Sequence, residues 1–205
     1  MYRKFGKRLL DILLSSCILI CLSPLYLLIA LAVVLDDPGP VFFRQKRVGI
    51  HKSYFMILKF RTMKMDAPKD TPTHQLDLPE HYITRVGRFL RKTSLDELPQ
   101  VFQILIGKMS FVGPRPALWN QFDLIEERDK FGANDVMPGL TGWAQINGRD
   151  ELPISVKAWF DGEYVRKQSF LFDCKCFLCT FLAVLRHDGV VEGGTGQLEK
   201  EKSEK

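Results

Sequence analysis

The chain has 205 residues, of which 46% are hydrophobic, so it can bury one sizeable core but is too short for two ordinary domains beside a membrane segment. Its 29 basic and 24 acidic residues give a net charge of +5, a modest excess that suits anionic lipid headgroups or phosphate substrates as well as nucleic acid. The five cysteines are an odd number, and Cys17 and Cys21 lie in an apolar run, which argues against a disulfide framework and favours a reducing compartment.

Three further cysteines, Cys174, Cys176 and Cys179, are close enough in sequence to suggest a zinc site. They lie in the apolar stretch 170–185, and no fourth ligand follows at a suitable spacing. We therefore interpret them as side chains that pack in a core.

The first predicted element is an apolar helix. Residues 12–35 are 24 residues without a charge, which as a straight helix would be ~36 Å long and would cross the hydrocarbon core of a bilayer. Ser23-Pro24 interrupts this run near its middle. Because Pro24 removes one helical hydrogen bond and clashes with the carbonyl group of Ile20, we expect a break there, relieved in part by the Ser23 hydroxyl.

Basic residues flank this apolar run on both sides. They are Arg3, Lys4, Lys7 and Arg8 before it, and Arg44, Lys46, Arg47 and Lys52 after it. Positive flanks favour the cytoplasmic side, and a straight span would place one of them outside. A helix broken at Ser23-Pro24 would instead dip into one leaflet and return, so we favour a re-entrant helix, with a kinked spanning helix as the alternative. A signal peptide fits less well, because the run is longer than a typical h-region and contains a central proline.

The next segments predict a small hairpin, a loop and a helix. After a turn at 36–40, residues 41–44 and 54–60 read as two strands around a basic loop with Gly49. Residues 65–79 are polar and contain prolines, as is typical of a loop, and loops of this length often serve an active site. A helix is predicted to begin near Thr84.

This predicted helix carries several cations at spacings of three and four. Arg85, Arg88 and either Arg91 or Lys92 fall on one face and form a basic stripe. The alternative interpretation of such a stripe is a solvated surface without a ligand.

A pair of adjacent carboxylates follows the basic stripe. Ser94 and Glu97 have the spacing of a capping box, which predicts a helix that runs to about residue 106. Pro99 is acceptable only near a helix start, so the first residue is open between Ser94 and Asp96. Either start places Asp96 at a helix N-terminus, where an anion is stabilised. Without the surrounding arginines, helix capping would be a sufficient explanation for Asp96 and Glu97.

The remaining segments are predicted more coarsely. Residues 113–116 indicate a rigid turn that presents the guanidinium of Arg115, and residues 138–148 indicate a glycine-punctuated loop. Residues 170–186 predict a helix that packs on the core or lies on a bilayer. From Glu192 the composition predicts a disordered tail. The sequence contains no internal repeat and no glycine-rich phosphate-binding loop.

Arginines beside carboxylates are the residue types that phosphoryl transfer needs. That reaction depends on positioning and charge neutralisation, so arginines, a divalent cation and a nucleophile in line with phosphorus would suffice. An aspartate with an ordinary pKa is ionised at neutral pH, so Asp96 could attack phosphorus without a separate base and form an aspartyl phosphate. Glu97 could hold Mg²⁺, which usually takes one or two carboxylates together with phosphate oxygens and water.

Motifs along nearly the whole chain, from Lys7 to Val190, resemble those of the monotopic phosphoglycosyl transferases, the bacterial sugar transferases that initiate glycan assembly on undecaprenyl phosphate. In order, the motifs are Lys7-Arg8 with Asp11, Ser23-Pro24, and residues 40–49, 59–63, 84–88, 95–100, 113–116 and 138–143. One short motif is weak evidence, but this many in the same order argue strongly against chance.

The resemblance implies an activity. A sugar-1-phosphate would pass from a UDP-sugar to undecaprenyl phosphate, a polyprenyl phosphate, with release of UMP, as the first membrane step of bacterial glycan assembly. Asp96 would be the nucleophile that forms a covalent aspartyl phosphosugar intermediate, and Glu97 the second residue of the dyad, which assists Mg²⁺ binding or proton handling. Further residues match substrate-binding positions: Arg91 and Arg115 for phosphates, with Lys59, Arg61 and Arg88 as weaker candidates.

The resemblance also implies an architecture and a location. We expect an α+β fold that is mainly helical with a small β-hairpin, and a re-entrant membrane helix broken at Ser23-Pro24. Its parts would be the membrane helix-break-helix (1–36), a catalytic domain on the cytoplasmic face (37–191) and a disordered charged tail (192–205). This would be the minimal, catalytic form of the family, monotopic in the bacterial inner membrane. The expected metal is Mg²⁺ at Asp96 and Glu97, and the expected partners are a UDP-sugar, undecaprenyl phosphate and membrane lipids, with no nucleic acid.

Four positions depart from the family pattern. Lys108 replaces a residue that is usually acidic, Gln103 stands where asparagine is common, and Cys174 and Cys176 occupy positions that are commonly aliphatic. Lys108 puts in doubt any polar network that the acidic residue would have made.

Two other functions are compatible with parts of the sequence. A glycosyltransferase that moves only the sugar would release UDP instead of UMP. A non-catalytic membrane scaffold, whose basic stripe holds anionic lipid or a partner protein, would release no nucleotide, but it gives no reason for carboxylates surrounded by arginines and rigid turns. The sequence leaves glucose, galactose and amino-sugar donors open, because one or two side chains can select among them.

Overall fold

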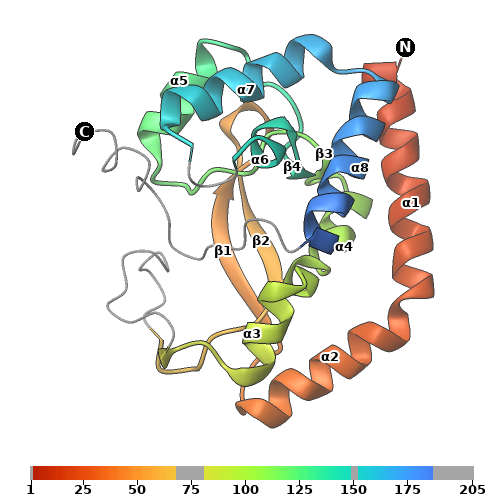
Figure 1. Cartoon of the computed structure of the whole chain (residues 1–205), viewed down its shortest axis with the longest axis vertical. Helices are drawn as coiled ribbons and strands as arrows, with labels where there is room; N and C mark the ends of the chain where they lie inside the picture. Colours follow the sequence, from red (N-terminus) through yellow and green to blue (C-terminus); the bar gives the residue numbers. More distant parts are fainter. Residues whose placement is uncertain (1, 68–80, 149–151, 187–205) are drawn as a thin grey trace.

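The computed structural model describes residues 2–67, 81–148 and 152–186 (Figure 1). The helices are α1 (Lys7–Cys21), α2 (Ser23–Asp36), α3 (Arg85–Lys92), α4 (Gln100–Leu105), α5 (Phe122–Asp129), α6 (Trp143–Ile146), α7 (Ile154–Lys167) and α8 (Phe170–Arg186). The strands are β1 (Phe42–Val48), β2 (Tyr54–Phe60), β3 (Ser110–Val112) and β4 (Gly139–Thr141). The predicted fold, mainly helical with a small antiparallel hairpin, is confirmed. Most of the loop expected at 65–79 and all of the tail expected at 192–205 lie outside the described residues.

The two N-terminal helices meet at Leu22 with a bend of 63°. The break falls at the predicted place, and the Ser23 hydroxyl donates to the carbonyl oxygen of Ile20 over 2.9 Å. Pro24 lies in the first turn of α2, where a missing N–H is tolerated. Across the described ranges no single helix is long and apolar enough to cross a membrane, whereas the bent pair together has that length and composition.

Polar side chains of α1 bind the rest of the protein. Lys7 forms a buried ion pair with Asp173 of α8, with Nζ and Oδ2 2.6 Å apart. The other oxygen of Asp173 accepts a hydrogen bond from the Tyr164 hydroxyl over 2.9 Å. One turn further along α1, the buried carboxylate of Asp11 accepts the backbone N–H of Phe111 at 3.1 Å. α1 is therefore attached to both β3 and α8.

Arg8 makes a further attachment, to the end of α4. Its guanidinium donates to the carbonyl oxygens of Ile104 and Leu105 at 2.5 and 2.6 Å. These carbonyl groups lie in the last turn of a helix, where they have no partner within the helix. Two cations interpreted from sequence as a membrane flank, Lys7 and Arg8, thus have protein partners as well.

The hairpin of β1 and β2 pairs Phe42 with Phe60 and Val48 with Tyr54. Its first strand continues to Val48 instead of ending at residue 44, because cross-strand pairing extends to the Gly49 loop. Gln103 of α4 covers the other edge of β2: its side-chain oxygen accepts the N–H of Leu58 at 2.9 Å, and its amide nitrogen donates to the carbonyl of Met56 at 2.6 Å. The Gln103 amide thus takes the place of a neighbouring strand.

The prediction of a loop over residues 138–148 is wrong. This segment contains β4 and α6, and β4 pairs in parallel with β3, with Ser110 opposite Gly139 and Val112 opposite Thr141. A Cβ atom on Gly139 would lie 2.1 Å from the backbone nitrogen of Gly113, so glycine is required for this close approach. Strands of three residues are too short to show a periodicity of their own.

Of the three clusters of buried side chains in the described part of the chain, one joins the hairpin to α5 and α7 (Val48, Ala117, Leu124 and Ala158), and the other two differ in size. The larger joins the hairpin, α4, β3, α7 and α8: Ile57, Val101, Ile104, Met109, Phe111, Val112, Tyr164 and Cys176. Cys176 is fully buried there, as expected of a packing residue, while Cys174 and Cys179 are half-buried. The smaller cluster joins α2 to the end of β2 and to α3: Ile29, Val33, Phe60 and Leu90.

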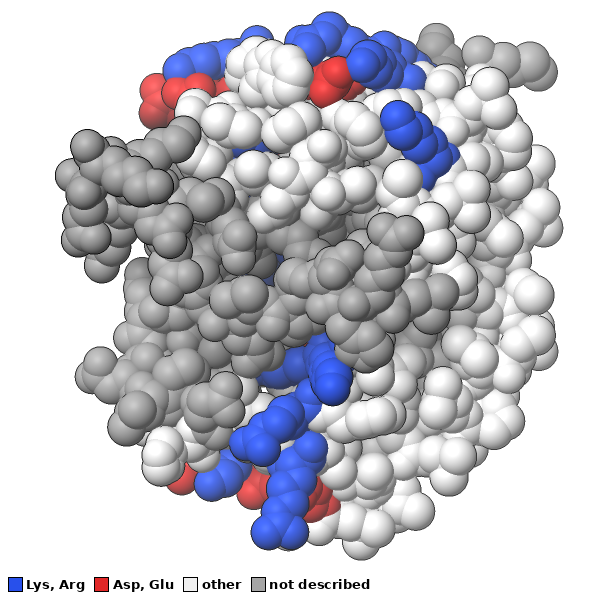
Figure 2. Space-filling view, in the orientation of Figure 1, with Lys and Arg blue, Asp and Glu red and all other residues white. Residues whose placement is uncertain are grey.

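The outer face of the bent pair is apolar. On α2, Leu27, Leu31 and Leu35 are all more than half exposed. Figure 2 shows no charged side chain over α1 and α2 on the right of the molecule, whereas basic side chains gather over α3. α8 matches the helix predicted at 170–186, and Asp173 faces the core while Leu171 and Leu178 are exposed.

Candidate active site

The Asp96-Glu97 pair lies in a short 3₁₀ turn, Leu95–Glu97, between α3 and α4. The predicted capping box is wrong, because Ser94 has a left-handed backbone with φ of 57° and its side chain makes no capping hydrogen bond. α4 begins only at Gln100, after Pro99. Pro99 has no N–H to give to a helix, so the regular helix starts beyond it. Asp96 therefore lies in the turn before α4, and not at the N-terminus of an α-helix.

Two cations from distant segments hold Glu97. Lys59 of β2 places its Nζ 2.7 Å from Oε1 of Glu97 and 3.9 Å from Oδ2 of Asp96. Arg115, from the rigid turn at 113–116, donates to the same Oε1 of Glu97 over 2.7 Å. The Asp96 side chain is only 12% exposed and the Glu97 side chain 18%, so these charges interact with little screening by water.

α3 brings a third cation, Arg91, to the same place. Its Nε donates to the hydroxyl of Thr62 at 2.8 Å, and its positive charge acts on Asp96. The close approach depends on Gly87, because a Cβ atom there would lie 2.1 Å from the Thr62 carbonyl oxygen. Sequence reasoning did not single out Thr62, although it lies in the motif 59–63.

Two other sequence candidates occupy different surroundings. Arg61 forms an ion pair with Asp37, and its Nε donates to the carbonyl oxygen of Pro40 at 2.8 Å, which fixes the connection from α2 to β1. Arg88 is exposed, one turn before Arg91 on α3. The structure thus brings Lys59, Arg91 and Arg115 to the carboxylates, while Arg61 holds the surrounding backbone.

The two carboxylates differ in acidity. Burial raises the pKa of Asp96 to about 6; Glu97 adds to this effect, while Lys59, Arg91 and Arg115 oppose it. Burial alone would raise the pKa of Glu97 as well, but its ion pairs with Arg115 and Lys59 outweigh burial and hold that pKa well below its ordinary range. Asp96 is therefore ionised at neutral pH but, unlike an ordinary aspartate, takes up a proton in mild acid.

The raised pKa predicts that Asp96→Asn stabilises the fold at neutral pH. The carboxyl has a pKa near 3.8 when unfolded and about 6 when folded, so the native state loses stability as pH rises from about 4 to above 6. We expect the free energy of unfolding of the variant to exceed that of wild type by up to about 3 kcal/mol at pH 7.5. At pH 4 the two free energies of unfolding should be almost equal. Thermal unfolding in EDTA at both pH values measures this; a variant less stable than wild type at pH 7.5 would contradict it.

The pair is chemically suited to hold Mg²⁺, which prefers carboxylate oxygens. Both ion pairs of Glu97 use Oε1, so Oε2 takes part in neither of them. In the part of the chain that the structure describes, no group of three His, Cys, Asp or Glu side chains could hold a metal ion. A cation at Asp96 and Glu97 would therefore need phosphate oxygens of a substrate to complete its ligands.

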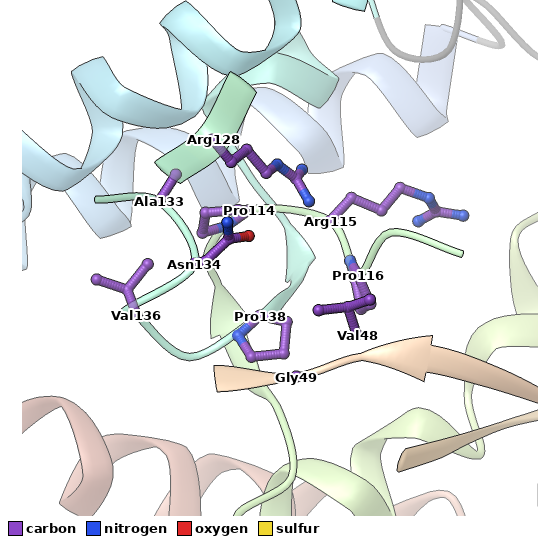
Figure 3. Close-up of a pocket in the computed structure, with 10 residues that line it drawn as sticks. All are labelled: Val48, Gly49, Pro114, Arg115, Pro116, Arg128, Ala133, Asn134, Val136 and Pro138. Carbon is purple, nitrogen blue, oxygen red and sulfur yellow. The ribbon is translucent and has the colours of Figure 1, made fainter. Parts of the chain in front are cut away.

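A small cavity lies behind the turn that carries Arg115 (Figure 3). Its volume is about 10 Å³, which excludes a nucleotide sugar. In Figure 3 the Arg115 side chain extends away from Ala133 and Asn134 on the opposite wall. Arg128, also in the lining, forms a buried ion pair with Asp161 at 2.6 Å that joins α5 to α7. This cavity belongs to the packing beneath the turn, and the carboxylates lie elsewhere.

Comparison with known proteins places the chain in a family. The family of bacterial sugar transferases matches residues 2–187. The chain is 44% identical over 182 residues to the UDP-glucose:undecaprenyl-phosphate glucose-1-phosphate transferase of Escherichia coli (strain K12), covering 85% of this chain and 39% of that protein. It is 40% identical over 191 residues to the protein of the same name from Xanthomonas campestris pv. campestris, covering 90% and 40%.

A third relative is similar in length. The chain is 40% identical over 185 residues to the uncharacterized sugar transferase EpsL of Bacillus subtilis (strain 168), covering 90% of this chain and 89% of that one. The chain thus spans about two fifths of the two named glucose-1-phosphate transferases and most of EpsL. The protein belongs to the bacterial sugar transferase family.

Proposed function

We propose that the protein transfers a sugar-1-phosphate from a UDP-sugar to undecaprenyl phosphate, with release of UMP, through a covalent intermediate on Asp96. The observation that carries this proposal is the buried Asp96 carboxylate beside three cations, Lys59, Arg91 and Arg115. The names of the two glucose-1-phosphate transferases supply the class of donor and acceptor. Anions with several phosphate charges are the substrates that such a cluster of cations suits.

In the first half-reaction, an oxygen of ionised Asp96 attacks the phosphorus atom that carries the sugar. A bond forms between this oxygen and phosphorus, and the bond from phosphorus to the bridging oxygen of the diphosphate breaks. UMP leaves with the electron pair of that bond. Because the carboxylate is ionised above about pH 6, no separate base is required.

In the second half-reaction, a phosphate oxygen of undecaprenyl phosphate attacks the same phosphorus atom. The bond from phosphorus to the Asp96 oxygen breaks, which restores the carboxylate and gives a lipid-linked diphosphosugar. Lys59, Arg91 and Arg115 neutralise charge on the phosphates in both steps. Glu97 holds Lys59 and Arg115 in position through its two hydrogen bonds. Mg²⁺, when held by Asp96 and Glu97, would neutralise further charge on the phosphate oxygens.

We also infer that α1 and α2 enter one leaflet of the bacterial inner membrane from the cytoplasmic face and return. Three observations support this: the 63° bend, the exposed leucines of α2, and the uncharged surface on the right of Figure 2, where the bent pair lies. A lipid-linked acceptor also requires an active site close to the membrane surface. A kinked helix that spans the bilayer is the alternative.

The test is nucleotide release by the purified protein in detergent or nanodiscs, with Mg²⁺, undecaprenyl phosphate and a panel of UDP-sugars. UDP-glucose comes first, because two relatives are named for it, followed by UDP-galactose and UDP-N-acetylglucosamine. We expect UMP from at least one donor, and loss of turnover when EDTA replaces Mg²⁺. Release of UDP would instead indicate a glycosyltransferase, and no nucleotide from any donor would favour the scaffold.

A further inference from the structure

α2 is hydrogen-bonded to the turn that carries the two carboxylates. The Tyr26 hydroxyl donates to the carbonyl oxygen of Leu98 over 2.6 Å, one residue after Glu97. The Tyr26 ring, half-buried, packs on Phe60 of β2 with the ring centroids 5.8 Å apart. Leu98 itself packs against the apolar cluster that contains Ile29. The helix pair therefore contacts the catalytic turn through both an apolar and a polar group.

The end of α2 is attached to two of the three segments that supply cations. The Asp36 carboxylate accepts the backbone N–H of Val86 at 2.8 Å, at the start of the helix that carries Arg91. Asp37 pairs with Arg61, which follows the strand that carries Lys59. α2 and the residue after it thus reach the carboxylate turn, the helix that carries Arg91 and the residue after the strand that carries Lys59.

The backbone of the turn is held by i to i+3 hydrogen bonds, from Glu97 N–H to the Ser94 carbonyl oxygen at 3.3 Å and from Leu98 N–H to that of Leu95 at 3.2 Å. It is a single 3₁₀ turn after a left-handed residue, Ser94, and it precedes a helix of six residues. The Leu98 carbonyl oxygen also accepts the N–H of Val101 at 2.9 Å, so the Tyr26 hydroxyl is its second donor. In-line attack on phosphorus requires the nucleophile to be placed to within a fraction of an ångström. A hydrogen bond two residues from Asp96 is therefore well situated to control its position.

We propose that Tyr26 is a positioning residue, through whose hydroxyl α2 fixes the Asp96-Glu97 turn in its reactive geometry. The bent helix pair is then part of the catalytic scaffold in addition to any anchoring. This inference rests on the proposed function, since it assigns Tyr26 a role in the step that Asp96 performs.

The test compares Tyr26→Phe, which keeps the ring and removes only the hydroxyl, with Tyr54→Phe as a matched control. Tyr54 lies on the exposed face of the hairpin, beneath the ammonium group of Lys46. In single-turnover reactions with whichever UDP-sugar of the panel gives UMP, we expect Tyr26→Phe to lower the rate constant of UMP release about tenfold. We expect little change in the KM for the donor, in the fraction of enzyme that reacts, or in membrane association. Tyr54→Phe should react like wild type.

The possible outcomes separate the two proposals. An unchanged rate constant for Tyr26→Phe, beside an active wild type and an inactive Asp96→Asn, would overturn the positioning role alone. A smaller reacting fraction with an unchanged rate constant would overturn it too, because it would indicate a loss of folded enzyme. A wild-type protein that releases no UMP from any donor would overturn the proposed function and this inference with it.

Discussion

Asp96→Asn is expected to lower UMP release by at least about 10⁴-fold, because an amide oxygen is a poor nucleophile toward phosphorus. The substitution preserves the size of the side chain, so the turn and its apolar contacts should persist. Membrane association should also remain, since Asp96 is buried and the exposed leucines of α2 are unchanged. Nucleotide release from the best donor, with and without undecaprenyl phosphate, measures the effect.

Mass spectrometry can test the covalent intermediate directly. With donor but without acceptor, wild type should gain one phosphosugar on the peptide that contains Asp96, and Asp96→Asn should gain none. Glu97→Gln keeps the nucleophile and should still form the adduct, more slowly. Asp135→Asn, on a carboxylate that is 70% exposed, is the matched control and should behave like wild type. An adduct on Asp96→Asn, or turnover near the wild-type rate, would reject Asp96 as the nucleophile.

The second large effect expected is on stability. Asp173→Ala leaves the Lys7 ammonium group, whose side chain is 10% exposed, without its counter-charge. It also removes the acceptor of the Tyr2 hydroxyl, which lies 2.5 Å from Oδ2, and one of the two acceptors of the Tyr164 hydroxyl, which keeps the Val112 carbonyl oxygen at 3.0 Å. Breaking a buried pair in this way lowers the free energy of unfolding by about 3–5 kcal/mol. Thermal unfolding in nanodiscs, with wild type alongside, measures the loss.

Two further variants test whether the loss of stability comes from the unpaired buried charge. The double variant Lys7→Met with Asp173→Leu removes both charges, so it should recover much of the lost stability. Glu127→Gln breaks an exposed ion pair with Lys130 and should have little effect. If Asp173→Ala unfolds no more easily than Glu127→Gln, Lys7 has no structural role and acts only as a positive flank of the apolar run.

Local chemistry made part of this structure predictable. Pro24 disrupts any helix that contains it, so the position of the break could be inferred from one residue and its neighbours. Thr84 caps α3 by accepting the N–H of Gly87 at 2.9 Å, as its position before the basic stripe suggests. In both cases the decisive interaction joins residues three or four apart, which is within the reach of sequence patterns.

Other features depend on partners that are distant in sequence. Lys59 and Arg115 were candidates by resemblance, but their spacing does not indicate that both bind the same oxygen of Glu97. The capping box was predicted from a correct local pattern, and it failed because Ser94 takes a left-handed backbone conformation and the helix starts only after Pro99. The β3–β4 pair depends on a close approach of backbones at Gly139, which the composition of either segment does not reveal.

The polar contacts of α1 have a consequence for the order of events during synthesis. Arg8 binds carbonyl groups 96 and 97 residues later, Asp11 binds an N–H 100 residues later, and Lys7 binds a carboxylate 166 residues later. None of these partners exists when α1 and α2 leave the ribosome, because the chain grows from its N-terminus. In the proposed membrane arrangement, Lys7 and Arg8 would at that time be free to orient the apolar helices at the bilayer. They bind Asp173 and α4 only once the rest of the chain has been made, so under the proposed arrangement one set of side chains would serve insertion first and folding afterwards.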